Sequence, residues 1–438
     1  MRLPRLRSEH DAAIGRLAVP ALGTLVAEPL YVLVDTAIVG HLGTTELAGL
    51  ALASTVLLTL HALLIFLAYG TTGTVSRLIG AGQPGAAAHR SVQSLWLAAG
   101  LGVVVVIVLR LFGSAALRLL GGEGAVLEAA ETYLFVSLAG FPFMLLLLAA
   151  SGSFHGRQNT RTPLVIAVSG AVLNLVIELI LVPGLGYGVG ASALSTVIAQ
   201  VLTGIAGTSL VIGWARSKVG SIRPELTEMR ATLRAGGALV VRTAALRGSF
   251  TLSVAVAASI GVHELAAHQI SMQLWSLLAL ALDSVAIAGQ ALTGRFLGAG
   301  DADRARSAAS RMIEIAVAVG TGLGVTVLLF RVPLAGLFSD DAAVIGLTTF
   351  ILVHVAIQQP LGGLVFALDG ILIGAGDLAY MARSMVIAAI LFTSMAAVIL
   401  LLDLGMGWLW AAIYVFMAAR AVTLWLRWRG TGWLVLGA

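Results

Sequence analysis

The chain has 438 residues, of which 59% are hydrophobic and only 11% are charged, and its mean hydropathy is +1.01. Soluble globular proteins carry about 25% charged residues, so this composition cannot supply a water-facing surface and excludes a soluble globular protein. It also excludes an intrinsically disordered chain. Because a membrane-spanning helix with its connection needs ~30 residues, the length allows roughly a dozen spans and predicts a polytopic α-helical membrane protein.

The charges and the missing cysteines exclude several further classes. No cysteine is present, which excludes disulfides, thiol catalysis and thiolate metal sites. The 26 Lys and Arg residues outnumber the 21 Asp and Glu residues, but they interrupt apolar runs and form no basic face, so no nucleic-acid partner is expected. Residues 1–16 lead into the first of many apolar segments, which favours a retained first helix over a cleaved signal peptide.

Breaks of Gly, Pro and charge divide the chain into twelve expected spans. One longer polar connection falls between the sixth and seventh spans and cuts the chain nearly in half. We therefore expect an N-terminal lobe over 1–214, a cytoplasmic connecting loop over 215–234 and a C-terminal lobe over 235–438. The expected spans are 14–40, 46–74, 91–116, 127–153, 162–184, 190–214, 235–260, 264–293, 307–330, 342–372, 378–402 and 406–427.

The distribution of basic residues predicts the orientation. With the N-terminus inside, most Lys and Arg residues fall at cytoplasmic ends and loops, while only Arg110, Arg118 and Arg331 fall outside. Arg242 and Arg247 lie within a span. Because cytoplasmic loops are enriched in Lys and Arg, we expect both termini in the cytoplasm of a multi-pass protein of the cell membrane.

The two halves of the chain repeat each other. Gly43 and Glu46 recur as Gly261 and Glu264, 218 residues later. Because each half has six spans, both halves enter the membrane in the same direction, as parallel repeats related by a pseudo-twofold axis along the membrane normal. Two six-helix bundles around a cleft are expected of an alternating-access transporter. Pairs with the same offset are Arg77 and Arg295, Gly80 and Gly298, Pro142 and Pro360, Gly152 and Gly370, and Gly156 and Gly374.

Enzyme motifs are not supported. His263 and His268 flank a glutamate, but zinc ligands on one helix face need a spacing of four residues, and these are five apart. The alternating glycines of 184–190 follow Pro183 and are typical of a turn, since no Lys-Ser/Thr follows them. No Gly-x-Ser-x-Gly is present, so serine hydrolase chemistry has no support. We expect no enzymatic activity.

The N-terminal half carries acidic residues within its spans. Charged groups at the centre of a membrane helix each cost about 2.5–3.5 kcal/mol. Asp35 follows Tyr31 by one turn in the first span, and Glu178 follows Asn174 by one turn in the fifth. No Lys or Arg occurs at their depth, so these acids indicate a proton or cation site. Glu28, on nearly the same face as Asp35, is either part of this site or solvated near the interface.

The C-terminal half carries charges of both signs within its spans. Arg242 and Arg247 lie in the seventh span, and Asp283 and Asp369 lie in the eighth and tenth. Two positive and two negative groups can cancel, which favours structural ion pairs, and substrate contact is the alternative. Gln269 belongs to a polar stripe that ends at Asp283. His61 in the second span is typical of a hydrogen-bonded core histidine, with a relay role as the alternative.

An ordered set of motifs resembles the multidrug and toxic compound extrusion (MATE) family, and its DinF-like branch in particular. Residues 34–43, VDTAIVGHLG, are similar to the family's first-helix signature. The resemblance covers essentially the whole chain. Further similar stretches are GAG at 80–82, RTP at 161–163, Asn174 and Glu178 before Pro183, AAHQI at 266–270, LDG at 368–370 and GAGD at 374–377.

The resemblance implies cation-coupled efflux with the coupling site in the N-terminal lobe. Asp35 matches the family's first-helix acid, with Tyr31 one turn before it, and Asn174 matches the fifth-helix asparagine. Thr196 matches a sixth-helix threonine near this cluster. Pro20 matches the first-helix proline at which bending on protonation has been proposed.

Two positions depart from the patterns of the family's branches. Glu178 stands where the DinF-like branch usually has Asp, which keeps a carboxylate but changes the geometry available to Na⁺. The NorM branch has acids in its seventh and tenth helices, where this chain holds Leu246 and Gly362.

The sequence therefore predicts a secondary active antiporter that exports small amphipathic, cationic compounds in exchange for H⁺, with Na⁺ at the Asp35, Asn174 and Glu178 cluster as the alternative. A lipid-linked precursor flippase of the same superfamily is the second candidate, because Arg242 and Arg247 could serve phosphates. A membrane enzyme would need a convergent nucleophile and base, and a receptor would not need unpaired intramembrane acids. We expect a monomer in the lipid bilayer without a cofactor or a resident metal.

Overall fold

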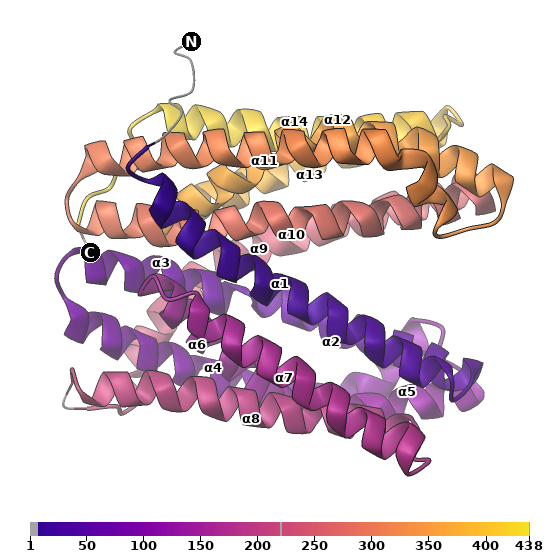
Figure 1. Cartoon of the computed structure of the whole chain (residues 1–438), viewed down its shortest axis with the longest axis horizontal. Helices are drawn as coiled ribbons and strands as arrows, with labels where there is room; N and C mark the ends of the chain where they lie inside the picture. Colours follow the sequence, from indigo (N-terminus) through magenta and orange to yellow (C-terminus); the bar gives the residue numbers. More distant parts are fainter. Residues whose placement is uncertain (1–7, 220, 438) are drawn as a thin grey trace. The chain divides into compact units, whose positions relative to one another are not determined.

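The computed structural model describes residues 8–219 and 221–437, and within these ranges all regular structure is helical. The helices of each half run side by side (Figure 1). The elements are α1 (Asp11–Gly40), α2 (Thr44–Leu64), α3 (Phe66–Gly80), α4 (Pro84–Leu119), α5 (Gly124–Ser137), α6 (Phe141–Gly156), α7 (Arg161–Leu179), the π-helical turn η1 (Ile180–Gly184), α8 (Val189–Arg216), α9 (Leu226–Ile260), α10 (Val262–Gly298), α11 (Ala302–Gly336), α12 (Ala342–Gly374), α13 (Leu378–Leu401) and α14 (Met406–Arg429).

The number of membrane-spanning helices agrees with the sequence prediction. Within the described residues, 11 helical segments are long and apolar enough to cross a membrane, and α2 with α3 forms one of them, Thr44–Gly80. The helices α5 and α6 meet at a bend of 52° and, counted as one broken span, bring the number of candidate spans to 12. The predicted all-α polytopic fold is confirmed.

The chain forms two compact units whose boundaries fall inside helices. Unit 2 is Pro20–Gly236, and unit 1 joins the start of α1, up to Val19, to Gly237–Ala438. Both α1 and α9 therefore pass from one unit to the other. The boundary in α1 falls at a proline and the boundary in α9 falls within a pair of glycines, residue types that weaken helix bracing.

The connection between α8 and α9 is shorter than predicted. The expected loop covered 215–234, but α9 already begins at Leu226. Its first turn contains Glu228, which suits the positive end of the helix dipole and forms an ion pair with Arg90 of α4. Nearby, the Gln93 side chain bonds the backbone of Arg223 and Glu225. These contacts order a segment that its polarity alone had predicted to be a loop.

The internal repeat is visible in the backbone. Gly82 and Gly300 end corresponding turns in the left-handed region, with φ of 71° and 76°. Gln158 and Gly376, also 218 residues apart, have φ of 60° and 74°. Gln158 is therefore an unusual non-glycine residue at a position where the other half uses glycine.

Equivalent glycines also allow equivalent helix contacts. A Cβ on Gly152 would collide with the carbonyl oxygen of Ala68, so α6 packs tightly on α3. A Cβ on Gly370 would collide with the carbonyl oxygen of Ala286, so α12 packs on α10 in the same way. In lipid the hydrophobic effect provides little driving force for helix association, so close packing of small residues is a main source of attraction between helices.

Unit 2 surrounds the acidic residues with packed helices. Gly23 of α1 lets Leu164 of α7 approach the backbone closely. Val39 of α1, Leu134 of α5 and Val189 of α8 are buried in one apolar cluster. Helices α1, α5, α7 and α8 thus carry the residues of the site described next.

Candidate functional site

Asp35 is held by two hydroxyl groups inside unit 2. Its side chain lies on α1 and only 4% of the residue is exposed. Ser192 of α8 donates a hydrogen bond of 2.5 Å to Oδ1, and the phenol of Tyr133 of α5 donates one of 3.4 Å to Oδ2. The carboxylate therefore joins three helices, and its donors are neutral.

Asn174 connects α7 to the same part of α8. It is 3% exposed, and its Nδ2 donates to the hydroxyl oxygens of Ser195, at 3.2 Å, and Thr196, at 3.0 Å. The Ser195 hydroxyl donates in turn to the carbonyl of Ser192 at 2.7 Å. A continuous polar network therefore extends from Asn174 through α8 to Asp35.

Glu178 lies one turn beyond Asn174 and is fully buried. Within the described residues, neither of its carboxylate oxygens has a hydrogen-bond partner of acceptable geometry, and its electrostatic neighbours are Asp35 and Ser192. The helix then changes to the π-helical turn Ile180–Gly184, which contains Pro183. Such turns are rare and often occur at functional sites.

A small cavity adjoins this network. Its volume is about 70 Å³, and Asp35, Tyr133 and Thr196 contribute to both the network and the cavity wall. The wall also contains buried polar atoms with no partner among the described residues, Oγ of Ser137 and Oε1 of Gln200. The remaining lining residues are Val32, Thr36, Ser54, Leu57, Leu58, His61, Phe141 and Met144.

The structure brings together Asp35, Asn174, Glu178 and Thr196, the four residues of the predicted coupling site whose side chains it describes. The side chains of Tyr31 and Glu28 lie outside the described residues. Ser192, Ser195 and Tyr133 were not predicted, and the spacing of the two serines on one face of α8 was the only signal. His61 lines the cavity, with Nδ1 3.4 Å from the sulfur of Met144.

Pro20 lies within α1 at the start of unit 2. It lacks the N–H that would bond the preceding turn. The Thr24 hydroxyl donates to the Pro20 carbonyl at 3.1 Å, a local bond of the kind that often bends helices. The predicted bending position therefore coincides with the point where α1 changes unit.

The C-terminal charges form a buried triad in unit 1. Oδ2 of Asp369 on α12 accepts hydrogen bonds from Arg242 of α9, at 2.5 Å, and from Arg420 of α14, at 2.7 Å. All three residues are at most 8% exposed. The predicted pairing of Arg242 with Asp369 is therefore present in the structure.

The predicted balance of two arginines against two aspartates is wrong. Arg247 is exposed on α9, and Arg420, which the sequence placed with the cytoplasmic charges next to Arg427, lies in the buried triad instead. Asp369 thus faces two guanidinium groups. Of the other predicted residues, Gln269 is exposed and Asp283 is half-buried, both on α10.

The described residues contain no group of three or more His, Asp or Glu side chains that could hold a metal ion. Among the described side chains, the oxygen-rich cluster around Asp35 and Glu178 contains these two carboxylates, with hydroxyl and amide groups beside them. Such a set could accept a proton or a hard monovalent cation, since carboxylate, hydroxyl and carbonyl oxygens are hard ligands.

Comparisons with known proteins identify the family. The MatE family profile matches residues 20–180 and 238–399. The first residues of these two segments are 218 positions apart, the same offset as the internal repeat. DNA damage-inducible protein F of Escherichia coli is 33% identical over 97% of this chain and 94% of its own length. Protein DETOXIFICATION 44, chloroplastic, of Arabidopsis thaliana is 32% identical, covering 94% of this chain and 82% of that protein.

Solved structures show the same fold. A MOP superfamily transporter from Pyrococcus furiosus superposes with a TM-score of 0.89 at 23% identity, over 97% of this chain and 96% of that one. The Vibrio cholerae MATE transporter VcmN has a TM-score of 0.88 at 19% identity, over 95% and 96% of the two chains. Together with the profile and the curated relatives, these similarities show that the chain belongs to the MATE family of multi-pass membrane transporters, with a DinF homologue among its relatives.

Proposed function

We propose that the protein is a secondary active antiporter that exports small amphipathic, cationic compounds in exchange for H⁺ entering the cell. The observation that carries this proposal is the buried pair of carboxylates, Asp35 and Glu178, beside a cavity of about 70 Å³. Among the described residues no basic side chain pairs with either carboxylate, and two buried negative charges in this setting are strongly unfavourable. The pair therefore requires a proton or a cation.

Either ion could satisfy the cluster chemically. A proton can be shared by adjacent carboxylates, which then titrate as a pair. Na⁺ would require several oxygen ligands, and the cluster offers Asp35, Ser192, Thr196 and the Oδ1 atom of Asn174. We favour H⁺ because the Glu178 oxygens lack hydrogen-bond donors among the described residues, and one proton supplies a donor while removing a charge.

Exchange follows if the ion and the substrate compete for the same charge. Asp35 belongs to both the network and the cavity wall. A cationic group of the substrate placed against the cavity wall would neutralise Asp35, and an entering proton would remove that attraction. Binding of one then disfavours binding of the other, which is the thermodynamic requirement for antiport.

The backbone supplies a way to convert this competition into movement. With Asp35 ionised, its bonds with Ser192 and Tyr133 hold α1 to α8 and α5. Protonation weakens these bonds, because hydrogen bonds to an ionised acceptor are the stronger ones. The first helix can then bend at Pro20, narrow the cavity and expel the substrate, as one step of alternating access.

The arginine–aspartate triad favours one other function. It carries one more positive than negative charge, as a site for phosphates would, so export of a lipid-linked precursor is the second candidate. Against it, both arginines already bond Asp369, and the cavity described above is lined by a carboxylate rather than by cations.

The orientation, the membrane and the assembly are also proposals. We propose that both termini are cytoplasmic, since most Lys and Arg residues then lie inside, and that the protein functions as a monomer in the cell membrane. It needs no cofactor besides the coupling ion, since coupling requires only the side chains already described.

Reconstituted transport tests these proposals. Proteoliposomes containing the purified chain would be given a pH gradient, a Na⁺ gradient or neither, and the movement of a fluorescent cationic dye would be followed. We expect dye movement with the pH gradient alone. Movement with the Na⁺ gradient alone would replace H⁺ by Na⁺. Translocation of a lipid-linked precursor, with no movement of dye, would support the second candidate.

A further inference from the structure

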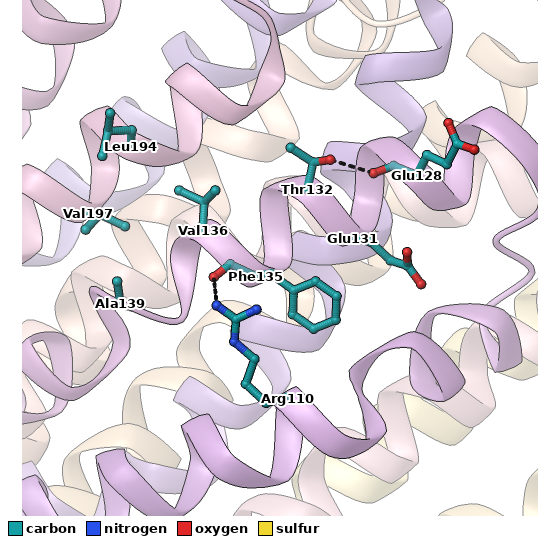
Figure 2. Close-up of a pocket in the computed structure, with 9 residues that line it drawn as sticks. All are labelled: Arg110, Glu128, Glu131, Thr132, Phe135, Val136, Ala139, Leu194 and Val197. Carbon is teal, nitrogen blue, oxygen red and sulfur yellow. Dashed lines mark hydrogen bonds between the residues drawn. The ribbon is translucent and has the colours of Figure 1, made fainter.

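Unit 2 contains a second and larger cavity that is separate from the Asp35 cavity. Its volume is about 690 Å³, and it lies among α4, α5 and α8 (Figure 2). The two cavities have no lining residue in common. The larger one is lined by Arg110, Glu128, Glu131, Thr132, Phe135, Val136, Ala139, Leu194 and Val197.

The described acidic and basic side chains of this cavity wall do not form ion pairs with one another. Within the described residues, neither Glu128 nor Glu131 nor any other carboxylate lies within 4.0 Å of the Arg110 guanidinium. Arg110 is instead fixed by Phe135, whose ring centroid is 5.0 Å away and whose carbonyl accepts a long hydrogen bond of 3.5 Å. Because guanidinium has five N–H donors, most of them remain available to a ligand.

Along the helix axes, the cavity wall changes from acidic to basic and apolar side chains. Glu128 and Glu131 lie four and seven residues after the start of α5, which at 1.5 Å per residue is about 6 and 10 Å from that helix end. The Arg110 guanidinium bonds the carbonyl of Phe135, which lies eleven residues after the start of α5, about 16 Å from that end by the same rise. Val136 and Ala139 follow Phe135 on the same wall, so the apolar part of the wall begins at the level of Arg110 and continues deeper.

The cavity also opens beside an apolar surface. Ile107 and Leu111, which flank Arg110 on α4, are 54% and 70% exposed, and Leu194 on the wall formed by α8 is 43% exposed. In a membrane-spanning bundle, exposed apolar side chains of this size face lipid. The cavity is therefore accessible from the bilayer near one end of unit 2.

From this order of groups we propose that the cavity binds a phospholipid whose head group contains a phosphate and a primary ammonium, as phosphatidylethanolamine does. The ammonium, which is outermost in a leaflet, is bound by Glu131 and Glu128. The phosphate below it is bound by Arg110, and an acyl chain packs along Val136 and Leu194. Figure 2 shows the Phe135 ring between the side chains of Glu131 and Arg110.

Neither an anionic lipid nor a cationic amphiphile fits all the charges of the wall. A phosphatidylglycerol head group would satisfy Arg110 but leave the carboxylates without a cation. A lipophilic cation would satisfy the carboxylates but leave Arg110 facing a like charge. Only a ligand that carries both charges, with the positive one at the shallower level, pairs with every charged side chain of the wall.

The test uses the full chain in nanodiscs with equal amounts of phosphatidylethanolamine and phosphatidylglycerol of identical acyl chains. Lipids that remain bound after gentle delipidation are quantified by mass spectrometry. The wild type should retain phosphatidylethanolamine in about fivefold excess, a ratio typical of partly exposed ion pairs. Arg110→Gln should lower retention of both lipids, whereas Glu131→Gln should lower only that of phosphatidylethanolamine.

Matched variants control for charge and for folding. Arg118→Gln and Glu123→Gln make the same chemical changes at exposed positions near the same helix ends, outside the cavity, and should retain lipid as the wild type does. Equal retention of the two lipids by the wild type would overturn the proposal. So would retention of tetraphenylphosphonium in place of lipid with dependence on Glu131 but not on Arg110, since that would make the cavity a site for cations.

Discussion

The hydroxyl of Ser192 donates a hydrogen bond of 2.5 Å to the carboxylate of Asp35. This bond joins α8 to α1, and it ends the network that begins at Asn174. If the ionisation of Asp35 controls the position of α1, Ser192 is the residue through which α8 responds to it.

Removing this hydroxyl should therefore weaken coupling without unfolding the protein. A hydrogen bond to a charged group contributes about 1.5–3 kcal/mol, so Ser192→Ala should slow gradient-driven efflux by at least about tenfold. Ser54→Ala is the matched control, because Ser54 lines the same cavity from α2. Equal efflux by both variants and the wild type, measured in proteoliposomes, would show that the bond has no part in coupling.

The buried triad of unit 1 makes an asymmetric prediction about stability. Asp369→Asn removes the carboxylate that Arg242 and Arg420 both bond, and breaking a buried ion pair costs about 3–5 kcal/mol. Arg420→Gln leaves one arginine with one aspartate, so its cost should be smaller. Arg247→Gln, at an exposed position, should change little.

Thermal unfolding in detergent measures this order directly. We expect the melting temperature to fall most for Asp369→Asn, less for Arg420→Gln and least for Arg247→Gln. If the losses of stability caused by Asp369→Asn and by Arg420→Gln are additive in the double variant, the two residues do not act as a pair. The triad would then be reassigned to substrate contact.

Asp341, which precedes α12 and lies outside the membrane-spanning segments, makes a pH-dependent contribution to the stability of the fold. Asp341 caps this helix by accepting hydrogen bonds from the backbone N–H groups of Ala343 and Val344, and these bonds hold its pKa below the usual 3.8. Since the folded pKa is the lower one, the stabilisation is present above pH 3.8 and is lost as the pH falls through the folded value.

Asp341→Asn should keep a cap while removing this pH dependence, because Asn is also a good capping residue. Asp341→Ala should remove both. Melting temperatures of the three proteins should therefore differ at neutral pH, and the wild type should lose its advantage over Asp341→Asn in strong acid, because a protonated carboxyl is a neutral acceptor like the amide. An unchanged difference between the wild type and Asp341→Asn across the titration would contradict a charged cap.

The first helix should transmit movement only if its ends are fixed. Asp11, at its start, forms a two-bond ion pair with Arg311 of α11, at 2.6 and 2.9 Å, while Pro20 begins the part in unit 2. Pro20→Ala restores a backbone hydrogen bond and should stiffen α1. We expect slower transport with unchanged substrate affinity, and a change in affinity alone would contradict the bending step.

The sequence predicted the acids of the candidate site but not their hydrogen-bond partners. Asp35, Asn174 and Glu178 are conspicuous because charged and amide groups are costly in a membrane. Ser192 and Ser195 are not, since serines are common in membrane helices and can bond their own backbone. Their role depends on the rotation of α8 against α1 and α7, which periodicity does not determine.

Two corrections have similar physical reasons. Arg420 lies seven residues before Arg427, so counting charges placed it at the cytoplasmic end, whereas the packing of α14 buries it against Asp369. The start of α9 at Leu226 was missed because its first turns are polar, and they are helical because α4 supplies partners such as Arg90. The number of spans was predictable, because their length and apolar composition are local properties.

The most direct test of the account is proton movement driven by substrate in Asp35→Asn proteoliposomes, followed with a pH-sensitive dye. Asp403→Asn is the matched control, because Asp403 lies in the turn between α13 and α14, where its φ of 51° also suits asparagine. We predict that Asp403→Asn moves protons as the wild type does, and that Asp35→Asn folds and inserts but moves none. Undiminished proton-coupled efflux by Asp35→Asn would place the coupling site elsewhere.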